Sequence, residues 1–278
     1  MRAGKLSIRV ISDGSFLLDG GTLFGQVPKV IWEQKAKADR KNRVRLGLNC
    51  LLIQNGDKNI LVDTGIGSKE PENLKEIYGL KCNKLLTSLR TLGLSVRQID
   101  VVVLTHLHFD HAGGATKIDR TGRATPTFPR AKYIVQKSCW EEASAPNERT
   151  RASFHADDFV PLKEKEQMVL IDGDCVIIPG VDIKVTNGHM KGHQAVIINT
   201  GGEKIAFSGD LIPTPYHVPI PFISAVDSYP EVTLQKKKEF LEQAIKEGWL
   251  LVFSHGFEQR AGYVESKNGK LQLRPVEI

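Results

Sequence analysis

Cysteine is scarce in this chain of 278 residues, with four in total, at positions 50, 82, 139 and 175. No two of them form a CxxC pair. This low number excludes a disulfide framework of the kind that holds small secreted domains together. Because isolated thiols are typical of a reducing compartment, we expect a cytoplasmic protein.

Long apolar runs are also missing. No segment approaches the roughly 18 apolar residues that a membrane-spanning helix needs, and the N-terminal residues have no apolar core of a signal peptide. Hydrophobic residues make up 41% of the chain and charged residues 25%, which is ordinary for a globular protein and excludes general disorder. We therefore expect no membrane partner and a core large enough to bury a metal site.

The chain also lacks a concentrated basic patch. Its formal net charge is +6, but the basic residues are scattered. The densest run, at 236–238, lies within a helical pattern and is interpreted as a solvated helix face. A nucleic-acid surface would combine clustered basic residues with aromatic stacking groups, and the sequence offers no such combination. We do not expect nucleic acid as a partner.

Short strand-like runs are abundant instead. Leu6–Ile11 alternates apolar and polar residues before a predicted turn at Asp13-Gly14. Residues 50–53 and 60–62 flank a turn-like Asn-Gly-Asp segment and predict a hairpin. A helix is predicted from Pro230 to a stop at Gly248. These patterns predict an α/β (α+β) chain rich in strands.

The two halves of the chain each run from strands to a helix to a strand, which suggests two packed sheets with helices outside. No linker divides them, so residues 1–278 are expected to form a single domain. Segment 20–48 mixes basic and apolar residues and is interpreted as a lid or as the arm of a homodimer. The polar stretch 149–159 is either a second lid or plain surface.

The strongest chemical signal is the segment Thr105-His106-Leu107-His108-Phe109-Asp110-His111, which follows an apolar run at 99–104. Imidazole and carboxylate groups are good ligands for zinc and related divalent ions. Because alternate residues of an extended loop point the same way, His106 and His108 can bind one ion. Asp110 and His111 lie further along and can reach a second ion.

Three more ligand-type residues follow predicted strands. They are His189, Asp210 and His255, and each has a small residue beside it. Loops at the ends of a rigid sheet are where binding sites are usually built. A surface histidine cluster is the alternative reading of the 106–111 motif. The joint pattern of seven such residues favours a metal site.

These motifs resemble those of the metallo-β-lactamase superfamily, in their order and over nearly the whole chain. The matching segments are Asn49–Ile53, Val62-Asp63-Thr64-Gly65, the 106–111 motif, Gly188-His189, Ser208-Gly209-Asp210 and Ser254-His255-Gly256. Within the superfamily the chain is most similar to the quorum-quenching-lactonase-like (methyl parathion hydrolase-like) branch. That branch carries segments like Asp19–Lys29 and Asp210–Thr214.

The resemblance implies a four-layer αββα sandwich and two divalent metal ions per chain. Zinc is the expected ion, with manganese, iron and cobalt as alternatives. The implied ligands of the first ion are His106, His108 and His189. The implied ligands of the second ion are Asp110, His111 and His255. Asp210 would bridge the two ions, Asp63 would order the 106–111 loop through hydrogen bonds, and His193 would support the site without binding metal.

The sequence departs from the wider family pattern at two places. Asn187 replaces a proline that stiffens the turn before the ligand His189, which bears on rigidity and substrate contacts rather than on the ligand. Some acyl-homoserine lactonases carry a tyrosine three residues after the bridging aspartate, but this chain has Pro213 there. The nearest tyrosine is Tyr216.

The expected function is that of a dinuclear-metal-dependent hydrolase, in which a metal-bridging hydroxide attacks a lactone or ester-like bond of a small molecule. Asp110 is the candidate to orient the nucleophile and to pass a proton to the leaving group. Tyr216 and His217 are candidates for substrate contact or proton donation. An alternative is a role as rim residues without chemistry.

Other functions stay open on the sequence alone. The same superfamily contains phosphotriesterases, phosphodiesterases, nucleases and thioesterases. A nuclease would need a basic channel, which is not evident. A non-catalytic metal-binding scaffold is the alternative from another class, although all seven ligand-type residues are present. The sequence does not rank lactone, aryl ester and phosphoester substrates.

Overall fold

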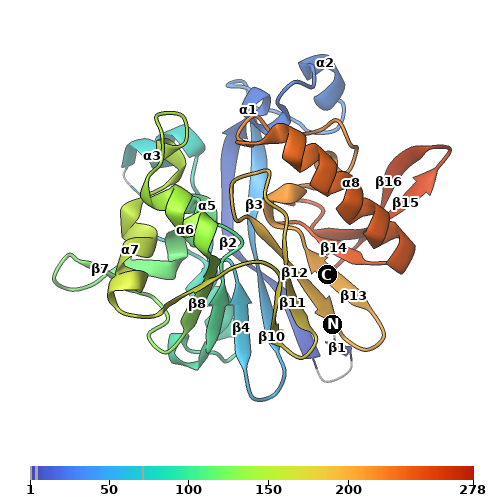
Figure 1. The fold of residues 1–278 in the computed structure, drawn as a ribbon. Coiled ribbons are helices and arrows are strands. Elements are labelled where there is room, and N and C mark those ends of the chain that lie inside the picture. The colour runs from blue at the N-terminus through green and yellow to red at the C-terminus, as the bar shows by residue number, and fades with distance from the viewer. Residues whose placement is uncertain (1, 4–5, 71) are drawn as a thin grey trace.

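The computed structural model of the chain describes residues 2–3, 6–70 and 72–278, and it is built around two mixed sheets (Figure 1). The first sheet has the strand order β1-β2-β3-β4-β5-β8-β9. Its strands span Arg2–Ala3 (β1), Leu6–Asp19 (β2), Arg43–Gln54 (β3), Asn59–Val62 (β4), Val101–Val103 (β5), Lys132–Gln136 (β8) and Met168–Ile171 (β9). The part of the chain up to Ile171 thus supplies one whole sheet.

The second sheet runs in sequence order from β10 to β16. Its strands span Cys175–Ile178 (β10), Val181–Val185 (β11), Gln194–Asn199 (β12), Lys204–Phe207 (β13), Leu250–Val252 (β14), Ala261–Lys267 (β15) and Lys270–Val276 (β16). A separate small hairpin consists of Thr116–Ile118 (β6) and Ala124–Pro126 (β7). Two consecutive parts of the chain therefore form one sheet each, as the repeated pattern predicts.

Helices cover the outer face of each sheet (Figure 1). They span Gly20–Phe24 (α1), Lys29–Trp32 (α2), Glu72–Tyr78 (α3), Leu85–Thr91 (α4), Phe109–Ala112 (α5), Lys137–Ser144 (α6), Ala156–Glu164 (α7) and Pro230–Glu247 (α8). Side chains of α4, α6 and α7 share one hydrophobic core with the first sheet. Those of α8 share another with the second sheet. The predicted αββα order of layers is confirmed.

Among the described helices, none combines the length and the apolar character needed to cross a membrane.

Alternation along the strands explains the layers. In β3, Leu51 and Ile53 point into the core between the sheets, whereas Cys50 and Leu52 point toward the helices. In β12, Val196 lies in the same central core, where Phe207 of β13 joins it. Successive side chains of a strand face opposite sides of a sheet, so a strand that is buried on both faces must be apolar throughout. The continuous apolar runs in the sequence reflect this double burial.

The turn predicted at Asp13-Gly14 is wrong. Strand β2 continues through it to Asp19 and contains a β-bulge there, where the pairing with β3 shifts between Ser12 and Gly14. Gly14 has φ +130°, and a Cβ atom at this position would lie 1.8 Å from the carbonyl oxygen of Lys81. A bulge requires the same glycine-permitted backbone as a tight turn, which is why the local sequence does not separate them.

The polar stretch 149–159 is more regular than expected. It contains a 3-10 turn, Arg151–Ser153 (η3), and the start of α7. Pro161 lies inside α7 and has no N–H for the carbonyl oxygen of Asp157. The hydroxyl of Thr116 donates to that oxygen instead, at 2.6 Å. The helix therefore tolerates its proline because a neighbouring side chain satisfies the freed carbonyl.

The ends of parallel strands define one edge of the sandwich. Strands β4 and β5 run parallel in the first sheet, and β13 and β14 run parallel in the second. The residues that follow these four strands are Asp63, the 104–108 loop, Ser208 and Phe253. Carboxyl ends of parallel strands meet at the same edge, where α/β proteins bind their ligands. Six of the seven predicted metal ligands lie in these connections, and the seventh, His189, follows β11.

Candidate metal centre

The 106–111 motif leaves β5 as a loop and then turns into α5. His106 and His111 are almost completely buried, and His108 is 6% exposed. Asp110 lies in the first turn of α5, and its side chain is 14% exposed. Asp63 anchors the start of the loop. Its carboxylate accepts hydrogen bonds from the backbone N–H and the hydroxyl of Thr105, at 2.7 and 2.9 Å. The motif is therefore a rigid, buried loop.

The second sheet supplies the other three side chains. His189 follows β11, Asp210 lies in the 3-10 turn Gly209–Leu211 (η4) after β13, and His255 follows β14. Gly209 has φ +51°, and a Cβ atom there would lie 2.6 Å from Nε2 of His193. Only glycine lets the chain pass this close to the histidine before Asp210. All three residues are buried.

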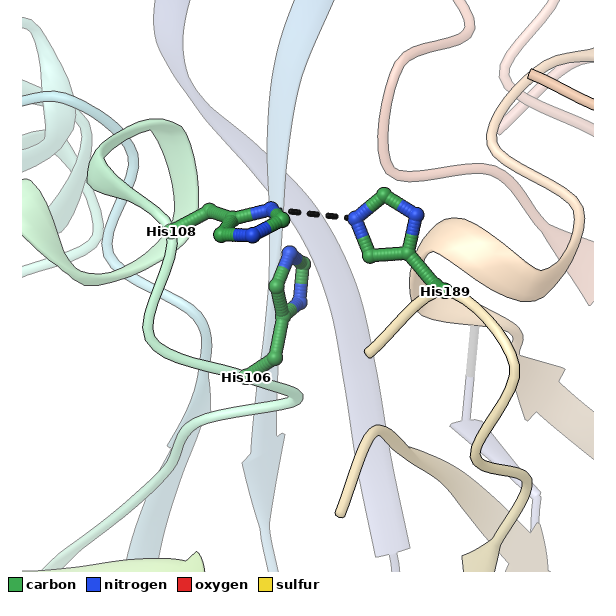
Figure 2. Close-up of side chains that lie close together, drawn as sticks. All are labelled: His106, His108 and His189. Atoms are coloured by element: carbon green, nitrogen blue, oxygen red, sulfur yellow. Dashed lines mark hydrogen bonds between the residues drawn. The ribbon is translucent and has the colours of Figure 1, made fainter. Parts of the chain in front are cut away.

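The first group of converging side chains is His106, His108 and His189 (Figure 2). Their ligand atoms all lie within 4.8 Å of one another. Nε2 of His189 lies 3.0 Å from Nδ1 of His108. Figure 2 shows the rings of His108 and His189 approaching from opposite sides above His106. Two histidines of the first sheet and one of the second thus meet across the sandwich.

The second group is Asp110, His111 and His255. Nε2 of His111 and Nε2 of His255 are 3.0 Å apart. Oδ2 of Asp110 lies 3.5 Å from Nε2 of His255. Asp210 stands between the two groups. Its Oδ1 is 3.2 Å from the Nε2 atoms of both His111 and His255, and its Oδ2 is 3.5 Å from Nε2 of His189. One oxygen of Asp210 thus faces each group.

Hydrogen bonds on the outer side of the rings set which nitrogen points inward. Nδ1 of His111 donates to Asp63 at 2.8 Å, and Nδ1 of His255 donates to the carbonyl oxygen of Gly47 at 2.9 Å. Nδ1 of His189 donates to Oδ1 of Asp227 at 2.7 Å. A proton on Nδ1 leaves Nε2 with a lone pair directed at the centre. Carboxylates and carbonyls hold metal-binding histidines in this way.

Burial and neighbouring charges set the protonation of the centre. Burial lowers the pKa of His106 and of His108 well below the usual value, and nearby histidines lower it further. Burial also disfavours a charged His111, but the carboxylates of Asp210, Asp110 and Asp63 outweigh it and raise its pKa well above the usual value. These carboxylates offer negative charge to whatever cation lies among them, a proton or a metal ion.

The residues present fit a pair of divalent cations. Nε2 of His106 is buried and has no hydrogen-bond partner among the described residues. Nε2 of His111 and Nε2 of His255 lie 3.0 Å apart, and both rings donate through Nδ1, so a proton or a metal ion must lie at this approach. Metal ions that replaced the protons would meet neutral imidazoles and carboxylates, which are the donor set that zinc prefers.

His193 lies beside the centre without joining either group. Its Nε2 accepts a hydrogen bond from the backbone N–H of Asp210 at 2.8 Å, and its Nδ1 bonds the hydroxyl of Thr186 at 2.5 Å. Both ring nitrogens are therefore occupied. The expected supporting position of His193 agrees with this geometry, because the ring holds the turn that presents Asp210.

The three residues named for catalysis are placed differently. Asp110 lines the cavity over the centre. His217 is buried behind the cavity wall, where Nδ1 bonds the hydroxyl of Thr214 at 2.8 Å and Nε2 donates to the carbonyl oxygen of Leu23 at 2.9 Å. Burial lowers the pKa of His217 to about 3. Tyr216 is half-buried against Phe24, with ring centroids 6.3 Å apart. Neither His217 nor Tyr216 lines this cavity.

The cavity wall is mostly apolar. Phe16, Leu46, Phe109 and Pro213 line it together with Leu23 of α1. Leu23 and Leu46 belong to segment 20–48, so part of this segment forms a wall of the cavity. Its interpretation as a lid or as the arm of a homodimer stays a prediction. No lysine or arginine lines the cavity in the part of the chain that the structure describes. The wall favours an apolar, uncharged group beside the centre.

The sequence analysis did not predict two residues of the site, Asp227 and Tyr78. Asp227 holds His189 from a loop that lies 38 positions further along the chain, and its neighbours carry no ligand pattern. Tyr78, at the end of α3, lines the cavity near Asp110, and burial followed by the charge of Asp110 raises the pKa of its hydroxyl. Only the fold brings these side chains to the centre.

Comparison with known proteins identifies the family. The sequence pattern of the Metallo-beta-lactamase superfamily matches residues 44–255, and the chain belongs to this superfamily. The chain is similar to an N-acyl homoserine lactonase of Bacillus cereus, with 26% identity over 235 residues, which cover 80% of this chain and 86% of the relative.

Solved structures give the same picture. A probable metal-dependent hydrolase from Staphylococcus aureus has a TM-score of 0.89 and 29% identity, with full coverage of both chains. AidC, a dizinc quorum-quenching lactonase in complex with the product N-hexnoyl-L-homoserine, shares the fold with a TM-score of 0.83 at 21% identity, over 100% of this chain and 97% of AidC. The expected resemblance to the superfamily and its lactonase-like branch is confirmed, and so is the prediction of an enzyme of this hydrolase class.

Proposed function

We propose that the chain is a dinuclear metal-dependent hydrolase that opens a lactone or ester-like bond of a small molecule. The observation that carries the proposal is the convergence of five imidazoles and two carboxylates, from both sheets, at the base of an apolar cavity. The names of the similar proteins support the same class of reaction.

The residues divide into two ligand sets with one shared carboxylate. His106, His108 and His189 would hold the first ion, and Asp110, His111 and His255 would hold the second. Asp210 would contact both, because its two oxygens face different groups. When bound, the ions supply an ionised water near neutral pH and polarise the substrate carbonyl. Zinc is our first choice of metal, since the donors are nitrogen-rich.

The chain's own side chains then position the substrate and move the proton. Asp110 is the least buried of the acidic ligands and lines the cavity, so its carboxylate can accept a proton from the attacking water and return it to the leaving oxygen. The apolar wall around Phe109 and Leu46 excludes bulk water and binds the acyl or alkyl part of the substrate. We assign His217 to the support of α1 rather than to proton transfer, since both of its nitrogens are occupied.

The cavity lining favours lactones and neutral esters over the rival substrates. A phosphodiester or a nucleic acid carries negative charge that lysine or arginine normally neutralises. Since no such side chain lines the cavity in the described part of the chain, these substrates have no local counter-charge apart from the ions. A neutral phosphotriester remains compatible with the wall and belongs in the same assay.

The test combines metal analysis with an assay on a chromogenic lactone, an aryl ester, an aryl phosphotriester and a bis-aryl phosphodiester. The variant is Asp210→Asn, and the matched control is Asp57→Asn at an exposed turn. We expect the wild type and the control to hold two ions per chain at this centre. In Asp210→Asn we expect loss of metal from this centre and a fall in lactone or ester hydrolysis of at least about 100-fold.

Other outcomes distinguish the rivals. Hydrolysis of the phosphodiester alone would favour a nuclease or phosphodiesterase, and preference for the phosphotriester would favour a phosphotriesterase. Two bound ions without turnover of any substrate would favour a metal-binding scaffold. Equal metal content in Asp210→Asn and the wild type would contradict the shared role of Asp210.

A further inference from the structure

A second cluster of ligand-type side chains lies outside the metal centre, behind Phe109. Glu70, His155 and Asp158 offer ligand atoms that all lie within 4.8 Å of one another. Nδ1 of His155 is 3.2 Å from Oε1 of Glu70 and 4.0 Å from Oδ2 of Asp158. The side chain of Glu70 is 3% exposed and that of Asp158 is 1% exposed. Two carboxylates are therefore buried side by side.

Two of the carboxylate oxygens have no partner. Oε2 of Glu70 and Oδ2 of Asp158 are buried and accept no hydrogen bond from the described residues. Lys69 neutralises one of the two charges, since its Nζ lies 3.0 Å from Oδ1 of Asp158. The same ammonium group also donates to the carbonyl oxygens of Gly113 and Thr116. A buried charge without a partner costs several kcal/mol, so a positive charge beside the second carboxylate would stabilise it.

A proton on His155 supplies a positive charge beside Glu70 but leaves both of these oxygens without a contact. Protonated Nδ1 would donate to Oε1 of Glu70, which is not one of the two oxygens that lack a partner. Its distance of 4.0 Å to Oδ2 of Asp158 is too long for a hydrogen bond. An ion placed among the three side chains can contact one ligand atom of each, since these atoms lie within 4.8 Å of one another.

We propose that Glu70, His155 and Asp158 form a third divalent-cation site, separate from the catalytic pair. One imidazole and two carboxylates are a donor set for zinc or manganese, and His155 is partly exposed, which leaves a route for entry. Lys69 stays on the far oxygen of Asp158 and limits the negative charge. The ion would offer positive charge to both buried carboxylates.

The position of this site connects it to the catalytic cavity. The ring of His155 stacks on Phe109, with centroids 5.3 Å apart and an angle of 25° between the planes. Phe109 lines the cavity and precedes Asp110. The neighbouring Phe154 packs against the ring of His108, at 4.8 Å between centroids. An ion held by Glu70 and Asp158 would therefore fix the start of α7 against the cavity wall.

The test counts Zn²⁺ and, in parallel, Mn²⁺ bound to metal-stripped full-length protein after equilibrium dialysis. Glu70→Gln removes a ligand charge with little change of shape. Glu72→Gln, an exposed glutamate two positions along, is the matched control. We expect Glu70→Gln to bind one ion per chain fewer than both the wild type and Glu72→Gln. We also expect a smaller rise in melting temperature on metal addition.

Two further variants keep the outcome clear. His155→Asn changes a partly exposed ligand, so it tests the site if Glu70→Gln folds poorly by circular dichroism. Asp210→Asn alters only the catalytic pair, and the ion that Glu70→Gln removes must persist in it. Equal ion counts in the wild type, Glu70→Gln and His155→Asn would overturn this third site. Equal counts in the wild type and Asp210→Asn would instead count against the proposed catalytic pair.

Discussion

At the scale of single residues, Asp63 and Asp227 occupy matching positions on the two sides of the metal centre. Asp63 accepts the Nδ1 proton of His111, and Asp227 accepts that of His189. The side chains of both aspartates are 2% exposed. Each carboxylate selects the ring tautomer that turns Nε2 inward and raises the basicity of that nitrogen.

We predict that Asp227→Ala weakens zinc binding by about 10–100-fold, because His189 loses the group that fixes its orientation. Competition with a chromogenic chelator measures the affinity. Asp227→Asn keeps an acceptor oxygen and should recover part of the loss, and Asp182→Ala on β11 is the control. Unchanged affinity in Asp227→Ala would contradict the positioning role.

The buried Lys237 holds the loop 219–222 in place. Its ammonium group donates to the carbonyl oxygens of Pro219, Ile220 and Phe222 at 2.9, 3.3 and 2.7 Å. The residue is 0% exposed, and burial lowers its pKa to about 7. Lys237 therefore fixes the loop that carries Phe222 against Phe24, with ring centroids 6.1 Å apart.

We predict that Lys237→Met lowers the free energy of unfolding by about 3 kcal/mol, because three buried carbonyls lose their donor. The folded protein releases the Lys237 proton near pH 7, whereas the unfolded chain keeps it until about pH 10.5. The unfolded state thus binds more protons between these values, and stability rises with pH there.

Urea unfolding between pH 7.5 and pH 9.5 tests this sign. The unfolding free energy of the wild type should rise relative to Lys237→Met by up to about 1.4 kcal/mol per pH unit. The metal centre titrates in both proteins, so it cancels in the difference. A difference that stays constant with pH would contradict the lowered pKa of Lys237.

At the scale of elements, the bulge in β2 connects three segments. Asp13 is 1% exposed, and its carboxylate accepts hydrogen bonds from four backbone N–H groups. Two belong to the loop after β4, at Ile66 and Gly67, and two to the start of α4, at Lys84 and Leu85. The bulge turns Asp13 inward to cap these segments, and the loop after β4 in turn contacts the glycines that follow the 106–111 motif.

We predict that Asp13→Ala destabilises the fold by at least about 3 kcal/mol, because four buried amides lose their acceptor. Asp13→Asn keeps one carbonyl oxygen and should cost less. Urea denaturation of both variants gives the two values. A loss below about 0.5 kcal/mol in Asp13→Ala would show that the carboxylate does not hold these segments together.

At the scale of the whole molecule, the metal centre connects the two sheets. His106, His108 and His111 come from the first sheet, whereas His189 and His255 come from the second. The apolar core between the sheets brings these residues within reach of one another. Bound ions would therefore act as cross-links between the two halves of the chain, in addition to their role in the proposed reaction.

We predict that removal of metal lowers the melting temperature and that Zn²⁺ restores it. An ion present at about 1,000 times its dissociation constant stabilises the folded state by about 4 kcal/mol. Scanning calorimetry of chelator-treated and reloaded protein measures the shift. Asp210→Asn should show a smaller response to Zn²⁺ than the wild type. Equal melting temperatures with and without metal in the wild type would rule out a cross-linking role.

Local sequence was enough to predict the elements that depend on periodicity. The hairpin of β3 and β4 and the helix α8 follow from residue spacing and turn residues, and the structure contains both. The 106–111 motif could also be predicted as a metal site, since its histidines and its aspartate are close together in the sequence. The bulge at Asp13-Gly14 was not separable from a turn, because both use the same backbone freedom of glycine.

The sequence by itself determined which side chains can bind metal and that they follow buried strands. Only the tertiary structure decided that Asp227 holds His189, that His217 is occupied behind the wall, and that Glu70 meets Asp158. The physical reason is how far apart in the sequence the interacting residues lie. Periodicity and ligand spacing involve neighbouring residues, whereas these contacts depend on how two sheets and their loops pack. Many sequences satisfy that packing equally well.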